Sequence, residues 1–273
     1  KETVYAYGET ARGSGIEPND STLFQIGSIT KVFTGILLAN SIHHQMVDSL
    51  SVLSKFLPDS IPKLAFKGKE IRLLDLAMHT SALPREPSNL GSTITDERNP
   101  FANYQEGDLM SYLKDAKLTY AVGEKYNYSN TGMGLLGYVL AKQRNTTYEE
   151  LLTTEICDKL EMNDTRTVLS ENQKKRMVKS YYQGKETPDF TFNEPFVGAG
   201  GIYSSVRDMF KFIEANLHPE RTTIEKDLVL AQQSREVNKY LSMGLAWDIS
   251  TVSSHDETTT VIGHSGNTMG ASS

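Results

Sequence analysis

The sequence has a single cysteine, Cys157, among 273 residues, so no disulfide can form within the chain. It also lacks any run of about 18 apolar residues, the length of a transmembrane helix, and it does not begin with the pattern of a signal peptide. Basic residues are in the minority, because 28 Lys and Arg against 34 Asp and Glu give a net charge of -6 at pH 7. Without a positive field to attract phosphates, we expect no nucleic-acid partner and no binding to an anionic membrane surface.

Metal-binding motifs are also lacking. The chain has six histidines, and no two of them stand four residues apart. His43 and His44 are neighbours in a helical segment, so we expect their side chains to point to different faces. With one cysteine and no suitable histidine pair, no metal site is expected, and nothing in the sequence points to a cofactor.

The secondary-structure signals separate the ends of the chain from its middle. Short apolar or alternating stretches near both ends are typical of strands, and apolar residues at helical spacing dominate the middle. This order favours an α+β protein, in which a sheet domain formed by residues 1–45 and 196–273 is interrupted by a helical domain at 46–195. Strands are predicted at 4–9, 21–27, 241–250 and 258–266, and helices from residue 28 and at 71–79, 107–116, 130–143, 147–160 and 205–217.

A serine and a lysine stand one helical turn apart where the first long apolar helix begins. Ser28 follows a strand-like stretch and Gly27, and Lys31 comes three residues later, so their side chains share a face and can touch. Backbone N–H groups at a helix start favour a developing negative charge, and burial lowers the pKa of a lysine until it can act as a base. Acyl transfer by a serine needs such groups. The alternative is a helix-start serine beside a surface lysine.

The spacing alone does not identify a nucleophile, because S-x-x-K occurs twice more, at Ser60/Lys63 and at Ser111/Lys114. A proline interrupts the first of these in a predicted loop. The second lies inside a predicted helix, where the backbone N–H groups are already bonded. The context of the three pairs therefore favours Ser28.

Two later motifs carry further candidate groups. Tyr128 and Asn130 form the one Y-x-N of the chain, and a tyrosine near a lysine can relay a proton while an asparagine amide holds a substrate carbonyl. The alternative for this motif is a turn that caps the helix after it. His264, in the G-H-S-G at 263–266, is either a titrating partner in the site or a strand-end histidine before a glycine turn.

The order S-x-x-K, Y-x-N, H-x-G resembles the serine hydrolase family that includes class C β-lactamases, D-alanyl-D-alanine carboxypeptidases and related esterases. The analogous set in class A β-lactamases and penicillin-binding proteins is S-x-x-K, S-D-N and K-T-G. The resemblance extends over nearly the whole chain. The segments similar to family blocks are 24–38, 73–84, 124–140, 160–168, 198–212, 243–249 and 263–273.

The resemblance implies a role for each matched residue. Ser28 is expected to be the acylated nucleophile and Tyr128 the general base, with Lys31 within hydrogen-bond reach of both. His264 occupies the place that a lysine usually holds in the family. The residues expected to bind substrate are Asn130, through an amide carbonyl of the substrate, and Ser265, Gly266 and Asn267.

The implied fold is an antiparallel sheet flanked by helices with an inserted all-helical domain, and the site lies between the two. The oxyanion hole is expected at the backbone N–H groups of Ser28 and Asn267. Members of the family usually have a helix and a strand before the position of Val4, and further strands and a helix after that of Ser273. Because open sheet edges are prone to aggregate, we expect that a segment outside this sequence or another chain completes the sheet.

The implied activity is that of a serine acyl-enzyme hydrolase without a cofactor, acting outside the cytoplasm on cell-wall-type D-peptides or on β-lactams. One departure leaves other substrates open. The chain has no K-x-G, and His264 is only partly charged at neutral pH, where the family's lysine is a fixed cation. An esterase that uses the same site is one alternative. A non-catalytic protein that binds peptidoglycan or a β-lactam as a sensor or scaffold is another, although a pure binder has no need for Lys31 and Tyr128 together.

Overall fold

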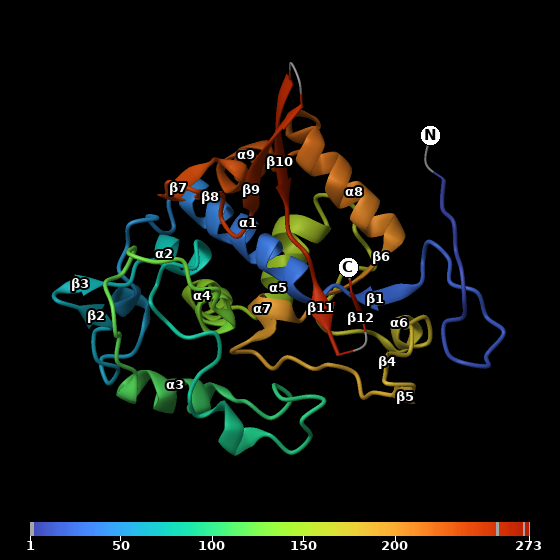
Figure 1. The fold of residues 1–273 in the computed structure, drawn as a ribbon, viewed down its shortest axis with the longest axis horizontal. Coiled ribbons are helices and arrows are strands. Elements are labelled where there is room, and N and C mark those ends of the chain that lie inside the picture. Colours follow the sequence, from blue (N-terminus) through green and yellow to red (C-terminus); the bar gives the residue numbers. More distant parts are fainter. Residues whose placement is uncertain (1–2, 255–256, 270, 273) are drawn as a thin grey trace.

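A long helix through the middle of the molecule is the element around which the others pack. Helix α1 (Thr30–His43) runs through the centre of the computed structural model, which describes residues 3–254, 257–269 and 271–272 (Figure 1). Its side chains are almost all buried, and it contacts helices from both halves of the chain. Its partners include α4 (Asn130–Gln143), α7 (Val197–Gly200) and α9 (Glu225–Gln232), and the other α-helices are α2 (Leu73–Ala77), α3 (Glu106–Asp115), α5 (Tyr148–Leu152), α6 (Glu171–Lys174) and α8 (Val206–Leu217).

The strands form small antiparallel sheets. The largest has the order β10-β9-β8-β7, and its β9-β10 hairpin projects from one end of the molecule beside α8 (Figure 1). A second sheet pairs β1 with β6, and the rest are two-stranded hairpins. Helices with antiparallel sheets confirm the predicted α+β class. The strands are β1 (Leu23–Gln25), β6 (Tyr203–Ser205), β7 (Arg235–Asn238), β8 (Leu241–Met243), β9 (Asp248–Ser254) and β10 (Glu257–Gly263), with the hairpins β2 (Ala65–Phe66)/β3 (Lys69–Glu70), β4 (Tyr181–Tyr182)/β5 (Lys185–Glu186) and β11 (Asn267–Thr268)/β12 (Ala271–Ser272).

The turn from β1 into α1 has a special backbone conformation. Gly27 has φ +53°, in the left-handed region that glycine adopts without strain. A short 3₁₀ turn, η1 (Gly27–Ile29), follows and leads directly into α1. Ser28 therefore lies on this turn, just before the first residue of the α-helix that the sequence predicts from residue 28.

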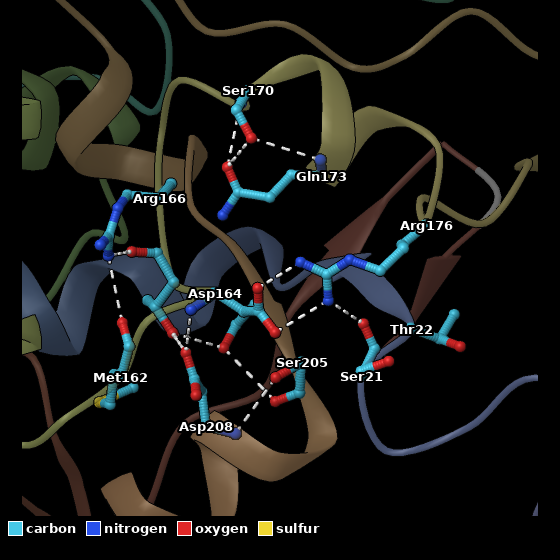
Figure 2. Close-up of polar contacts among 12 residues, drawn as sticks. Ser21, Thr22, Met162, Asp164, Arg166, Ser170, Gln173, Arg176, Ser205 and Asp208 are labelled. Carbon is cyan, nitrogen blue, oxygen red and sulfur yellow. Dashed lines mark hydrogen bonds and ion pairs between the residues drawn. The ribbon is translucent and has the colours of Figure 1, made fainter.

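A polar cluster fixes the loop that packs against β1 and β6 (Figure 2). Asp208, in the first turn of α8, accepts hydrogen bonds at Oδ2 from the backbone N–H of Asp164 (2.7 Å) and from Thr165 Oγ1 (2.9 Å). Asp164 also forms an ion pair with Arg176, whose Nη1 donates to the carbonyl oxygen of Ser21 at 2.6 Å. These contacts hold the chain just before β1, the strand that leads into the candidate site.

The predicted helices are largely confirmed, and the larger differences concern strands. The predicted strand at 4–9 is wrong, because Tyr5 and Tyr7 are 91% and 99% exposed and no described strand pairs with this segment. The segment 241–250 contains two strands instead of one, since the chain turns where the N–H of Gly244 donates to the carbonyl of Trp247. Helix α5 is shorter than predicted and continues as a π-helical turn over Thr153–Cys157.

The predicted division into a sheet domain and a helical domain stays a prediction. Helix α1 contacts α4, which belongs to the predicted helical domain of residues 46–195, and also α9, which belongs to the predicted sheet domain of residues 1–45 and 196–273.

Within the described residues, no helix is both long and apolar enough to cross a bilayer.

The close approach of α1 to the turn between β8 and β9 gives a testable prediction. A Cβ on Gly35 would lie 2.0 Å from the carbonyl oxygen of Leu245, so Gly35→Ala must displace backbone. We expect it to lower the free energy of unfolding by at least about 2 kcal/mol in urea denaturation. Gly91→Ala is the matched control, because a Cβ there meets nothing within 4 Å. Equal stability of the two variants would contradict this close approach of α1 to the backbone of Leu245.

Candidate active site

Lys31 is a fully buried amine in the first turn of α1. Its Nζ donates to the carbonyl oxygen of Ala199 in α7 at 2.6 Å and lies 3.0 Å from Oγ of Ser28. Burial lowers the pKa of Lys31 to about 7, against a smaller opposing effect of the Glu86 carboxylate, and Arg85 lowers it further. Near neutral pH, a substantial fraction of Lys31 is therefore an uncharged amine that can accept a proton.

Ser28 lies between two groups that carry protons. Tyr128 Oη donates to Ser28 Oγ at 2.8 Å, although the two residues are 100 positions apart in the sequence. When Lys31 is neutral, the hydroxyl of Ser28 can donate to Nζ while its oxygen accepts from Tyr128. The structure thus brings together three of the residues that the sequence analysis selects, in an arrangement that can pass a proton.

Tyr128 is fixed by the rings and cations around it. The ring of His79 stacks on it with 4.5 Å between centroids, and Arg85 Cζ lies 5.1 Å from the centroid of the tyrosine ring. His79 Nδ1 accepts a hydrogen bond from the backbone N–H of Ser129, and burial lowers the pKa of His79 to about 3, so this ring is neutral. Burial raises the pKa of Tyr128, with the hydrogen bond to Ser28 opposing it. The phenol therefore keeps its proton at neutral pH.

His264 follows β10 and faces the same site. Its ring centroid is 6.2 Å from that of Tyr128, and its Nδ1 is 2.7 Å from the carbonyl oxygen of Ser265, to which it donates. Burial lowers the pKa of His264, while the hydrogen bond to Ser265 opposes the shift. At neutral pH the ring is predominantly uncharged, so it offers hydrogen bonds but no fixed positive charge.

Asn130, the first residue of α4, is held by a carboxylate. Its Nδ2 donates to Oε1 of Glu86 at 2.9 Å, and Arg85 Nε lies 3.6 Å from the same oxygen. Burial raises the pKa of Glu86, and its Oε2 is buried without a hydrogen-bond partner among the described residues. Since a primary amide has a second N–H and a carbonyl oxygen, Asn130 can bind another group while Glu86 fixes its plane.

The backbone of the serine turn lies against β11. A Cβ on Gly27 would be 2.9 Å from both the nitrogen and the oxygen of Asn267, so only glycine allows this approach. The main chains of Ser28 and Asn267 are thereby neighbours, as the expected oxyanion hole requires. Gly266 is buried, whereas Ser265 and Asn267 are exposed. The binding roles of these residues stay predictions.

The two other S-x-x-K pairs have none of these surroundings. Ser60 and Ser111 are both exposed, and so is Lys114. Lys63 pairs at the surface with Glu70, 3.0 Å from Nζ to Oε1. Neither lysine is buried as Lys31 is.

The sequence predicts no function for three residues of the site, which are His79, Arg85 and Glu86. The signal that points to His79 is the similarity of residues 73–84 to a family block. Nothing in the sequence pattern shows that the loop after this block folds back onto Tyr128, because that contact depends on tertiary packing.

Comparison with known proteins identifies the family. The family model described as Beta-lactamase matches residues 1–273, so the chain belongs to the Beta-lactamase family. The Escherichia coli (strain K12) protein named D-alanyl-D-alanine-carboxypeptidase/endopeptidase AmpH is 28% identical over 255 residues, which cover 89% of this chain and 64% of that protein.

Proteins named Beta-lactamase are similar as well. That of Yersinia enterocolitica is 24% identical over 254 residues, covering 91% of this chain and 62% of the relative. That of Providencia stuartii is 29% identical over 219 residues, covering 80% and 53%. The chain thus spans less than two thirds of the length of these curated relatives.

The buried amine of Lys31 predicts an unusual dependence of stability on pH. The folded state releases the proton of Lys31 near pH 7 and the unfolded state near pH 10.5, so between these values the unfolded state binds one more proton. The free energy of unfolding of the wild type should therefore rise relative to Lys31→Met, by up to about 1.4 kcal/mol per pH unit.

Urea denaturation at several pH values between 7 and 10 measures this difference. The matched control is Lys114→Met, since Lys114 is exposed on α3 and should follow the wild type at every pH. Parallel pH curves for the wild type and Lys31→Met would contradict the lowered pKa.

Proposed function

We propose that this chain carries the active site of a serine acyl-enzyme hydrolase of the penicillin-binding protein and β-lactamase type. Its substrates are D-amino acid peptides or β-lactams, whose amide bond is cleaved through an acyl-enzyme on Ser28. The observation that carries the proposal is the contact of Ser28 Oγ with Lys31 Nζ at 3.0 Å and with Tyr128 Oη at 2.8 Å. Family membership and the relatives named as carboxypeptidase and β-lactamase support it.

The proton of Ser28 passes to Lys31 when the hydroxyl attacks the carbonyl carbon. The pKa of Lys31 is lowered to about 7, whereas that of Tyr128 is raised above its ordinary value, so the amine is the stronger candidate for the base in the free enzyme. This assignment differs from the family expectation that Tyr128 is the base. The carbonyl oxygen of Ala199 stabilises the ammonium that forms.

Tyr128 then serves as the acid. Its phenol holds a proton next to Ser28, so it can protonate the nitrogen of the leaving group when the amide bond breaks. The ammonium of Lys31 returns the proton to the phenol, so the acyl-enzyme forms with no net gain or loss of protons. Water then attacks the ester of Ser28, and the same groups act in reverse order.

The remaining groups bind and orient the substrate. The backbone N–H groups of Ser28 and Asn267 stabilise the negative charge on the tetrahedral intermediate. The two main chains are neighbours because Gly27 allows the backbone of Asn267 to come close. Asn130, held by Glu86, binds an amide group of the substrate side chain. Peptides with D-amino acids belong to the cell wall. We therefore further propose an extracytoplasmic location, as the family resemblance implies.

An acylation experiment tests the proposal. Incubation with a panel of β-lactams and with a fluorophosphonate should add the mass of one reagent, located on Ser28 by peptide mapping. Ser28→Ala should remove the adduct. Ser111→Ala should keep it, because Ser111 has the same S-x-x-K spacing on the surface of α3. A folded wild type that reacts with none of these reagents would refute the proposed function.

His264 favours a second candidate, an esterase that uses the same catalytic groups. An uncharged ring at the position of the family's lysine does not provide a fixed cation for a substrate carboxylate. Esters without a carboxylate lose nothing from this replacement. Turnover of p-nitrophenyl acetate without turnover of nitrocefin would favour the esterase.

A substitution at His264 tests this reasoning. A hydrogen bond to a charged group contributes about 1.5 kcal/mol or more, so His264→Lys should raise kcat/KM for nitrocefin relative to p-nitrophenyl acetate about tenfold. His218→Lys is the matched control, since the side chain of His218 is 45% exposed and this residue follows the C-terminal end of α8. An unchanged ratio in His264→Lys would show that this position does not select carboxylate substrates.

A further inference from the structure

Two histidines and an aspartate form a cluster at the far end of α1 from Ser28. One ligand atom from each of His43, His44 and Asp227 lies within 4.8 Å of the others, and these are the one such group of three or more found among the described residues. His43 and His44 are at the C-terminal end of α1, and Asp227 is in the first turn of α9. The cluster therefore joins two elements that are far apart in the sequence.

The sequence predicts that the two imidazole rings point to different faces, and this prediction is wrong. Their centroids are 4.7 Å apart and the ring planes are tilted by 33°. The reason is that α1 ends at His43, and His44 is the residue after it, with φ -82° and ψ 9°. Neighbouring histidines at a helix end can thus lie side by side, and both can face one ion.

Asp227 is held in position for a role as a ligand. Its side chain is 3% exposed, while that of His43 is 33% exposed. Oδ1 lies 2.8 Å from His43 Nδ1, and Oδ2 accepts a hydrogen bond from Asn40 Nδ2 at 2.8 Å. Asn40 is fixed in turn by Arg144, which pairs with Glu155. Carboxylates and imidazoles that bind metals are typically oriented by such outer hydrogen bonds.

We propose that His43, His44 and Asp227 form a binding site for a divalent transition metal such as Zn²⁺. Imidazole nitrogens suit Zn²⁺, Cu²⁺ and Ni²⁺, and a carboxylate supplies the negative charge. The C-terminal end of α1 adds the partial negative charge of the helix dipole. In a tetrahedral zinc site, ligand atoms are about 3.4 Å apart. The exposed ring of His44 must therefore turn slightly toward the other two, and His43 Nδ1 and Asp227 Oδ1, now 2.8 Å apart, must separate slightly.

Binding changes the tautomer of His43. The hydrogen between Nδ1 and Asp227 Oδ1 leaves to solvent while Nε2 takes one up, so the imidazole stays neutral and the ion takes the place of that hydrogen between the two atoms. A fourth position, not filled by any of the three side chains, remains for water. The site lies at the opposite end of α1 from the proposed nucleophile, so its effect is to fasten α1 to α9, and it takes no part in acyl transfer.

Titration calorimetry with ZnCl₂ in a non-chelating buffer tests the proposal, with thermal unfolding as a second readout. The wild type should bind one Zn²⁺ per chain, and Zn²⁺ should raise its Tm. His44→Ala removes an exposed ligand without touching the core, and should weaken binding at least about tenfold. Asp227→Asn, which keeps the shape but removes the charge, should do the same.

His218→Ala is the matched control. His218 also lies near a carboxylate, 3.5 Å from Nδ1 to Oε1 of Glu220, but it belongs to no group of three possible ligands among the described residues. It should leave the affinity and the stoichiometry unchanged. The proposal is overturned if the wild type binds no Zn²⁺, if His44→Ala binds as tightly as the wild type, or if His218→Ala weakens binding to the same extent.

Discussion

The proposed catalytic arrangement depends on one amine that is buried away from water. Lys31 is fully buried in the first turn of α1, where its Nζ contacts Ser28 Oγ and the carbonyl oxygen of Ala199. The low dielectric of this position disfavours the ammonium and brings its pKa to about 7. Protonation of such a buried group lowers the stability of the fold, and in the proposed mechanism the same amine makes the hydroxyl of Ser28 reactive. A more polar pocket would stabilise the ammonium form of Lys31. The fold would then be more stable, but the amine could not act as a base near neutral pH.

The rest of the site follows from how α1 is positioned. Gly27 lets the chain leave β1, place Ser28 on a 3₁₀ turn and run against the backbone of Asn267. Gly35 lets the helix approach the backbone of Leu245. Tyr128, two residues before α4, completes the contact with Ser28, and the ring of His79 stacks on it. Gly27 and Gly35 thus determine how closely these main chains approach each other, and the positions of the polar side chains in the site depend on that approach.

Much of the site was predictable because its motifs are short and lie at element boundaries. Ser28 and Lys31 are linked by helix geometry, and the start of α4 at Asn130 follows from the apolar pattern after it. The contacts of His79 and Glu86 could not be predicted, since they depend on a loop folding onto Tyr128 and Asn130. The strand expected at 4–9 and the divergence expected for His43 and His44 failed for a related reason. Sequence periodicity predicts the type of an isolated element. It does not show whether a strand finds a partner among the described strands, or how side chains are arranged where a helix ends.

The most direct test of the account is the pKa of Lys31 itself. Nuclear magnetic resonance of the protein with ¹³C-labelled lysine follows each ε-carbon through a pH titration, and the signal that disappears in Lys31→Met belongs to Lys31. This signal should titrate near pH 7, well below the ordinary pKa of a lysine. A signal that titrates above about pH 10 would show that Lys31 is a permanent cation and cannot accept the proton of Ser28.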